Sequence, residues 1–167
     1  FALRFPTCRA LCASILDSQL KSESFDCIAV VGGLHHMPPH VHDTLTEIHR
    51  LLRPGGYFCF AEPHRGSLPD RARRWWYRND SLFEENEAAV DFEALKKAFV
   101  SKFAFKKETY GGNLAYLLVQ NSLIFRVPLR LKAVYASILL KLESLLMKCQ
   151  PPYLSCFITG QWQKRNA

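Results

Sequence analysis

Two apolar runs on either side of an amphipathic segment dominate the hydrophobic pattern of the chain. The first run, residues 27–31, is continuous, which is typical of a strand buried on both faces of a parallel sheet. Residues 41–52 then place apolar side chains at intervals of four, three and four, which predicts an amphipathic helix. The sequence Pro54-Gly55-Gly56 stops this helix, and the second run, residues 57–61, predicts another strand. The order strand, helix, strand indicates an α/β fold.

The pattern continues toward the C-terminus with a helix and two strands. Asp91 is a suitable N-cap for a helix whose apolar residues Phe92, Leu95 and Phe99 share one face. Residues 103–108 predict the strand that follows. Alternation over residues 153–163 predicts a final strand.

Residues 113–149 interrupt this alternation, and we expect them to form a helical insertion within a single domain that covers residues 1–167. In the predicted helix 133–148, one face carries four aliphatic residues: Val134, Ile138, Leu142 and Leu145. Such faces usually pack on a core. A wall for a hydrophobic substrate and a contact with lipid are the alternatives.

Five short motifs follow one another in order between residues 25 and 63. They are Phe25-Asp26 at the start of a strand, Leu34-His35-His36 after it, Glu47-Ile48 in the helix, Leu52-Arg53-Pro54-Gly55-Gly56 in the turn, and Glu62-Pro63 after the next strand. This ordered set resembles the second half of class I S-adenosylmethionine-dependent methyltransferases. The resemblance implies a Rossmann-like sheet with strand order 3-2-1-4-5-7-6 and S-adenosylmethionine as cofactor.

Two features of that family have no counterpart in this chain. The family's first strand ends in a glycine-rich loop, and its second strand ends in an acidic residue that binds the ribose hydroxyls. This chain has no G-x-G-x-G motif and does not begin with Met. We therefore expect an N-terminally truncated sheet without strands one and two, in which the strand at residues 25–31 has an unpaired edge. Alone, such a chain is expected to be inactive.

The resemblance assigns cofactor-binding residues to the carboxyl ends of the strands. The candidates are Ser14, Ile15, Gly32, Gly33 and Leu34. The two glycines allow the backbone to approach a ligand closely, although a plain turn would also explain them. Ser14 stands where many family members have an Asp that accepts a hydrogen bond from the adenine amine.

His35 and His36 are the candidate catalytic residues, because they follow the strand at the edge where methyl donor and substrate meet in this family. An imidazole suits a general base, since its pKa is near neutrality. We expect only one of the two rings to point into the cleft. A zinc site needs three or four converging ligands, so the additional histidines His40, His42 and His49 are interpreted as solvated, and no metal site is predicted.

Two carboxylates flank these strands. Asp26 lies at the amino end of its strand, where we expect it to hydrogen-bond the nearby turn. Glu62 ends its strand at the cleft, where it could contact substrate or cap the structure.

The formal net charge of +7 changes this picture little. A basic balance favours anionic partners in general, but acidic residues in a longer chain would offset it, and nucleic acid is not the expected partner. The run from Arg71 to Arg78, with two Trp and one Tyr, could cover a substrate, contact a membrane surface or pack on the domain. Six cysteines without a C-x-x-C motif favour a reducing, cytoplasmic location.

These observations predict an enzyme that transfers a methyl group from S-adenosylmethionine to a small, hydrophobic acceptor. The alternative is a non-catalytic module with the same fold that contacts a membrane or a partner through the basic aromatic run. Peripheral membrane contact is compatible with both. The sequence leaves the oligomeric state open.

Overall fold

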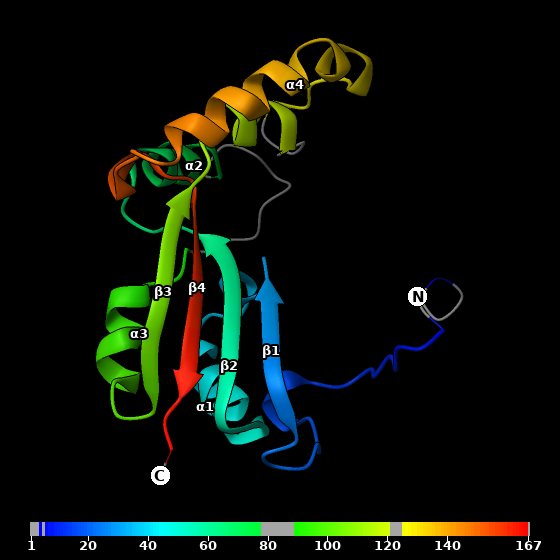
Figure 1. Cartoon of the computed structure of the whole chain (residues 1–167), viewed down its shortest axis with the longest axis vertical. Helices are drawn as coiled ribbons and strands as arrows, with labels where there is room; N and C mark the ends of the chain where they lie inside the picture. Colours follow the sequence, from blue (N-terminus) through cyan, green and yellow to red (C-terminus); the bar gives the residue numbers. More distant parts are fainter. Residues whose placement is uncertain (1–3, 5, 78–88, 121–124, 167) are drawn as a thin grey trace.

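The structure, a computed structural model, describes residue 4 and residues 6–77, 89–120 and 125–166. Its centre is a four-stranded sheet in the order β1-β2-β4-β3, formed by β1 (Phe25–Val31), β2 (Leu52–Pro63), β4 (Phe157–Lys164) and β3 (Phe103–Gly111). β1 and β2 are parallel, whereas β4 runs antiparallel to both β2 and β3. This is the 4-5-7-6 part of the strand order that the resemblance implies. Among the described residues, β1 pairs only with β2, so its outer edge is open (Figure 1).

The core lies on one face of the sheet, beneath α1 (Val41–Leu51) and α3 (Phe92–Phe99). Trp162 of β4 is fully buried there, and its ring contacts five phenylalanine rings from β2, β3 and α3: Phe58, Phe60, Phe92, Phe103 and Phe105. The predicted cap of α3 is confirmed, because the side chain of Asp91 accepts a hydrogen bond from the Ala94 amide at 3.0 Å. Thus α1 and α3, which the sequence pattern predicts, both cover the core.

The predicted turn Pro54-Gly55-Gly56 lies inside β2, which begins at Leu52 and not at residue 57, and this turn needs its two glycines. Gly55 has φ = +76°, a conformation that favours glycine. At Gly56, an added Cβ would lie 2.9 Å from the carbonyl oxygen of Arg53 and 3.1 Å from that of Asp26. The Asp26 carboxylate also accepts a hydrogen bond from Arg53 at 2.7 Å. The predicted contact between Asp26 and the turn is thus confirmed.

Two expectations for the strands are wrong. β1 is not buried on both faces: Cys27 and Ala29 are exposed, and Val31 is 78% exposed. The reason is that the core cluster occupies only the opposite face of the sheet, where Ile28 and Val30 pack against it. The last strand begins at Phe157 instead of residue 153, because the chain first forms a short 3-10 helix, η4 (Pro152–Leu154).

Three helical segments lie beyond the carboxyl ends of β1 and β2, at the top of Figure 1. They are α2 (Leu68–Tyr77), the π-helical turn η3 (Tyr116–Gln120) and α4 (Leu129–Leu146). Residues 113–149, which we expected to form an insertion, contain η3 and α4. None of the helices in the described segments is long and apolar enough to cross a membrane.

The orientation of α4 overturns the expectation that its aliphatic face packs on a core. Val134, Ile138 and Leu145 are between 61% and 77% exposed, whereas Lys132 and Glu143 are buried. Polar contacts to the preceding segment explain this orientation. The Glu143 carboxylate accepts hydrogen bonds from two backbone amides that precede or begin η3, and the ammonium of Lys132 donates to the carbonyl of Val119 at 2.9 Å.

Candidate active site

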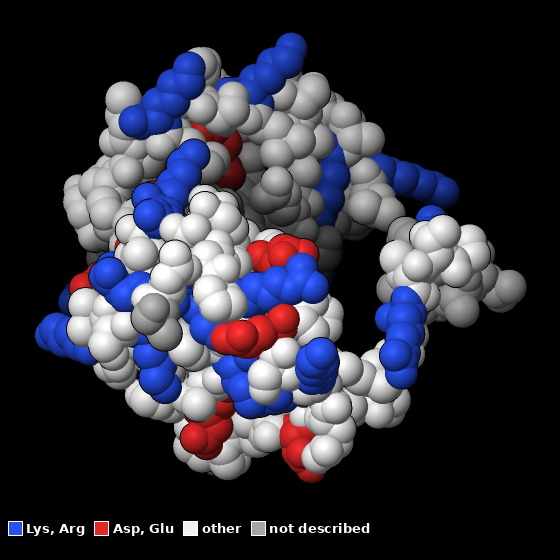
Figure 2. All heavy atoms as spheres, turned by 60° about the horizontal axis from the view of Figure 1, so that its bottom comes forward, with Lys and Arg blue, Asp and Glu red and all other residues white. Residues whose placement is uncertain are grey.

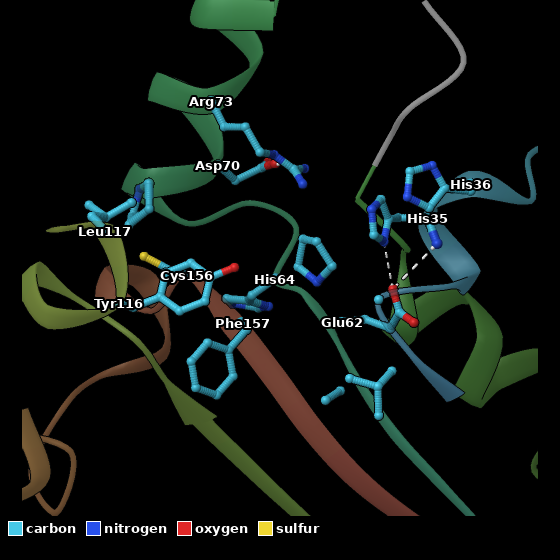
Figure 3. A pocket seen from close by; sticks show the side chains of 15 residues that line it. His35, His36, Glu62, His64, Asp70, Arg73, Tyr116, Leu117, Cys156 and Phe157 are labelled. Carbon is cyan, nitrogen blue, oxygen red and sulfur yellow. Dashed lines mark hydrogen bonds and ion pairs between the residues drawn. The ribbon is translucent and has the colours of Figure 1, made fainter. Parts of the chain in front are cut away.

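A buried carboxylate joins the ends of the two parallel strands. Glu62, near the end of β2, is 1% exposed. Its Oε1 accepts hydrogen bonds from the backbone amides of Gly33 at 2.8 Å and Leu34 at 2.9 Å, in the loop that follows β1. Figure 3 shows the same carboxylate next to His35. The parallel pairing of β1 with β2 brings these groups to the same edge of the sheet. Glu62 therefore holds in place the loop that carries His35 and His36, called the histidine loop below.

The same carboxylate orients His35. Oε2 of Glu62 lies 2.8 Å from Nδ1 of His35, and the His35 side chain is only 14% exposed. When Nδ1 carries the ring proton, it donates a hydrogen bond to this carboxylate, and Nε2 presents a lone pair. The pair thus has the arrangement of a general base oriented by an acidic residue.

Beside it, the ring of His36 is tilted, with its centroid 4.0 Å from that of His35. Both histidines line the same cavity, although we expected only one of them to do so.

The cavity has a volume of about 480 Å³ and lies at the carboxyl ends of β1 and β2, below α2 and η3. This is the edge of an α/β sheet where ligands bind. Apolar residues form much of its wall: Val31, Ala61, Pro63, Pro69, Leu117 and Phe157. The polar side chains on the wall are His35, His36, Glu62, His64, Asp70, Arg73 and Tyr116. A small molecule with an apolar body and one or two polar groups would match this wall.

An ion pair on α2 belongs to this wall and was not predicted from the sequence. Asp70 is 3% exposed and lies 2.7 Å from Arg73, and it also accepts a hydrogen bond from the Gly66 amide at 2.9 Å. The Asp-to-Arg spacing of three residues could have indicated the pair. We had interpreted Arg73 only as one member of the basic aromatic run.

The rest of that run divides between the cavity and the surface. Arg71 and Arg74 are exposed, and Trp75 is 66% exposed, so most of the Trp75 side chain faces solvent, in contrast to the interpretation in which this run packs on the domain. The side chains of residues 76–78 lie outside the described part of the structure.

His64 and Cys156 are two further wall residues that sequence reasoning missed. Burial lowers the pKa of His64, although the charges of Asp70 and Glu93 oppose this shift. The ring of His64 packs against the edge of Tyr110, with 4.8 Å between centroids. Burial raises the pKa of the Cys156 thiol to about 12, so this thiol is not an activated nucleophile.

The five predicted cofactor residues occupy different places. Gly32 lines the cavity, has φ = +59° and donates its amide to the Ala61 carbonyl at 2.8 Å. Gly33 is not part of the cavity wall. Leu34 is fully buried in the core, so its side chain does not face the cavity.

Ser14 and Ile15 lie apart from the cavity wall. The exposed Ser14 caps the short helix η1 (Ile15–Asp17), in which Ile15 is half-buried. This helix is held against α1 by a hydrogen bond of 2.6 Å from Ser18 to Glu47. The chain before it runs away from the sheet beyond β1 (Figure 1).

All six cysteines are free, and Cys27 Sγ lies 4.0 Å from Cys59 Sγ across β1 and β2. No group of three or more His, Cys, Asp or Glu in the described residues could hold a metal ion.

Comparison with known proteins agrees with this geometry. Residues 2–60 match the family model described as a methyltransferase domain. The structure of a SAM dependent methyltransferase from Archaeoglobus fulgidus aligns with 93% of this chain and 66% of its own, with a TM-score of 0.58 and 13% identity. The chain has the class I methyltransferase fold.

The chain is also similar to two further proteins. The N-methyltransferase NodS from Bradyrhizobium japonicum, in complex with S-adenosyl-L-homocysteine, aligns with 99% of this chain and 60% of its own, with a TM-score of 0.53 and 13% identity. A probable polyketide synthase of Dictyostelium discoideum is 32% identical over 75 residues, which are 42% of this chain. The match spans only 2% of that synthase.

Proposed function

We propose that this protein transfers a methyl group from S-adenosylmethionine to a hydroxyl group on a small, largely apolar acceptor. The family match and the structural neighbours support methyl transfer in general. The observation that carries the finer proposal is the contact between Glu62 and His35 at the wall of the cavity. It provides a base where the acceptor would lie, and the apolar wall would hold the acceptor's body.

The residues next to the cavity fit the cofactor's reactive end. Gly32 lies beside His35 with an exposed backbone and no side chain between β1 and the open space. The Glu62 carboxylate already accepts the amides of the following residues and holds this stretch rigid. When bound, S-adenosylmethionine supplies an electrophilic methyl group on a sulfonium. Gly32 and Gly33 would form the floor beneath that group.

The chain's own residues would then align and deprotonate the acceptor. A lone pair of the acceptor oxygen forms the new bond to the methyl carbon, and the pair of the broken carbon–sulfur bond stays on sulfur. His35 Nε2 takes the hydroxyl proton, while the proton on Nδ1 remains hydrogen-bonded to Glu62. Alignment within the cavity contributes most of the rate, since displacement at a sulfonium methyl needs little other assistance.

The test compares His35→Gln with the matched control His40→Gln, both made in a longer form of the protein that includes the strands and glycine-rich loop that this chain is expected to lack. His40 is exposed, its Nδ1 lies 3.6 Å from the exposed carboxylate of Asp43, and it is not part of the cavity wall, so its replacement should leave the cavity intact. Calorimetric titration with S-adenosylmethionine measures binding first, and transfer of a labelled methyl group to small hydroxyl compounds measures activity. We expect His35→Gln to keep cofactor binding and to lower kcat by about 10²–10⁴-fold. Equal rates for the two variants would exclude His35 as the base.

A second candidate is a non-catalytic module that binds an anionic partner through α2. The exposed Trp75, flanked by the exposed Arg71 and Arg74, favours it. This candidate predicts no heat of binding with S-adenosylmethionine, so the same titration separates it from the first.

A further inference from the structure

The polarity of α4 is reversed relative to a helix that packs on a protein core. The face that meets the domain carries the charged side chains of Lys132 and Glu143, and both are satisfied by backbone groups. The aliphatic residues point away from the domain, and none of them belongs to the core cluster. An apolar surface of this size on a helix usually marks a contact with another molecule or a lipid phase.

Five of the exposed aliphatic residues of α4 form one continuous stripe. They follow one another at intervals of three, four, four and three residues, which keeps them on one line of a helix with about 3.6 residues per turn. The members of this aliphatic stripe are Leu131, Val134, Ile138, Leu142 and Leu145, each at least 50% exposed. The helix is about 27 Å long, because each of its residues rises about 1.5 Å. The stripe is therefore long, narrow and straight.

A row of cations runs beside the aliphatic stripe. Arg130, Lys141 and Lys148 are all exposed, and Lys148 lies just beyond the end of α4. Their intervals of eleven and seven residues correspond to about three and two helical turns, so they share a second line along the helix. This cation row lies next to the stripe and away from the face that packs on η3.

The basic residues at the other end of the molecule differ from this cation row, because they have carboxylate partners. Around the amino ends of β1 and β2, Lys and Arg alternate with Asp and Glu (Figure 2). There, Arg53 lies 2.7 Å from Asp26, and Arg50 lies 2.7 Å from Glu47. In the described parts of the chain, no carboxylate lies within salt-bridge distance of the cation row.

We propose that α4 docks on an anionic lipid bilayer, parallel to the membrane plane. The aliphatic stripe enters the boundary between headgroups and acyl chains, and the cation row contacts the lipid phosphates. A second copy of the chain is a poorer occupant, because facing helices would bring like charges together. This surface is distinct from the catalytic cavity, and the proposal does not depend on methyl transfer.

Vesicle flotation of the full chain tests the proposal. The probes are vesicles of phosphatidylcholine alone and vesicles of phosphatidylcholine mixed with phosphatidylglycerol. We expect binding to the mixed vesicles only, and we expect added salt to weaken it because salt screens exposed charges. Each basic residue near an anionic surface contributes roughly fivefold to partitioning, so Lys141→Gln with Lys148→Gln should lower it about 25-fold.

Matched variants separate the α4 surface from net charge. Lys106→Gln with Lys107→Gln removes the same charge from exposed positions on β3, and it should leave partitioning within about threefold of the parent chain. Ile138→Asn with Leu145→Asn interrupts the aliphatic stripe and should abolish binding while circular dichroism shows an unchanged helix content.

Three results would overturn the proposal. The first is equal loss in the β3 and α4 charge variants, and the second is absence of binding to the mixed vesicles. The third is concentration-dependent dimerisation in sedimentation velocity that the Ile138→Asn, Leu145→Asn variant abolishes, because it would assign the stripe to a second copy.

Discussion

Replacement of Glu62 by Gln should destabilise the protein measurably, although the change preserves the shape of the side chain. Glu62 makes three hydrogen bonds of 2.8–2.9 Å, to the Gly33 amide, the Leu34 amide and His35 Nδ1. A hydrogen bond to a charged group contributes about 1.5–3 kcal/mol, and one between neutral groups about 0.5–1.5 kcal/mol. Loss of the charge therefore weakens the three bonds by about 3 kcal/mol in total.

The net loss should be smaller, because the folded chain no longer has to bury a charge at that position. We expect the free energy of unfolding to fall by about 2 kcal/mol. In a chain of this size, such a loss lowers Tm by about 4–8 °C. Urea denaturation and thermal melting, both followed by circular dichroism, would measure the two quantities.

Asp26→Asn provides the matched control, since it removes a carboxylate from the other end of the same strand pair. Asp26 and its partner Arg53 are both exposed, with 81% and 53% of their side chains accessible. An exposed pair of this kind contributes below about 1 kcal/mol. If Glu62→Gln were no more destabilising than Asp26→Asn, Glu62 could not be what holds the histidine loop.

Two further predictions concern pH and the turn at Gly55-Gly56 inside β2. We expected His49 to be solvated, but it is half-buried, with its ring centroid 5.2 Å from that of Phe103. Burial lowers the pKa of His49 and of His64 below the ordinary 6.5. As the pH falls below 6.5, the unfolded chain takes up these protons first, so the free energy of unfolding should decrease. In the double variant His49→Gln, His64→Gln, the free energy of unfolding should depend less on pH between about pH 5 and 7, as measured by urea denaturation. An unchanged pH dependence would show that these two histidines do not cause it. Gly56→Ala should lower the free energy of unfolding by about 1–3 kcal/mol in the same assay, because its Cβ would lie 2.9 Å from the Arg53 carbonyl, and a neutral result would show that the turn can relax.

The sequence predicted best where local pattern and chain order decide the structure. The apolar runs at residues 27–31 and 57–61, separated by one amphipathic helix, were sufficient to predict a parallel pair of strands. That pairing in turn placed the histidine loop next to Glu62. Whether Glu62 would contact substrate or hold the loop stayed open, because the answer depends on the direction of one side chain.

The orientation of α4 shows where sequence reasoning reaches its limit. Aliphatic residues at helical spacing indicate that a helix has an apolar face, but the spacing is the same whether this face points inward or outward. Here the direction is decided by contacts between distant residues, such as the one from Glu143 to the Asn113 amide. The same limit applies to β1, whose exposure depends on what packs against it and not on its own composition.

Glu143 makes the outer helix and the cavity wall one mechanical unit. Its carboxylate accepts the amides of Asn113 and Tyr116 at 3.1 and 3.0 Å, and Tyr116 is part of the wall. A force that tilts or shifts α4 would therefore pull on the backbone beside the cavity. A molecule that binds the outer face of α4 would therefore change the width of the cavity.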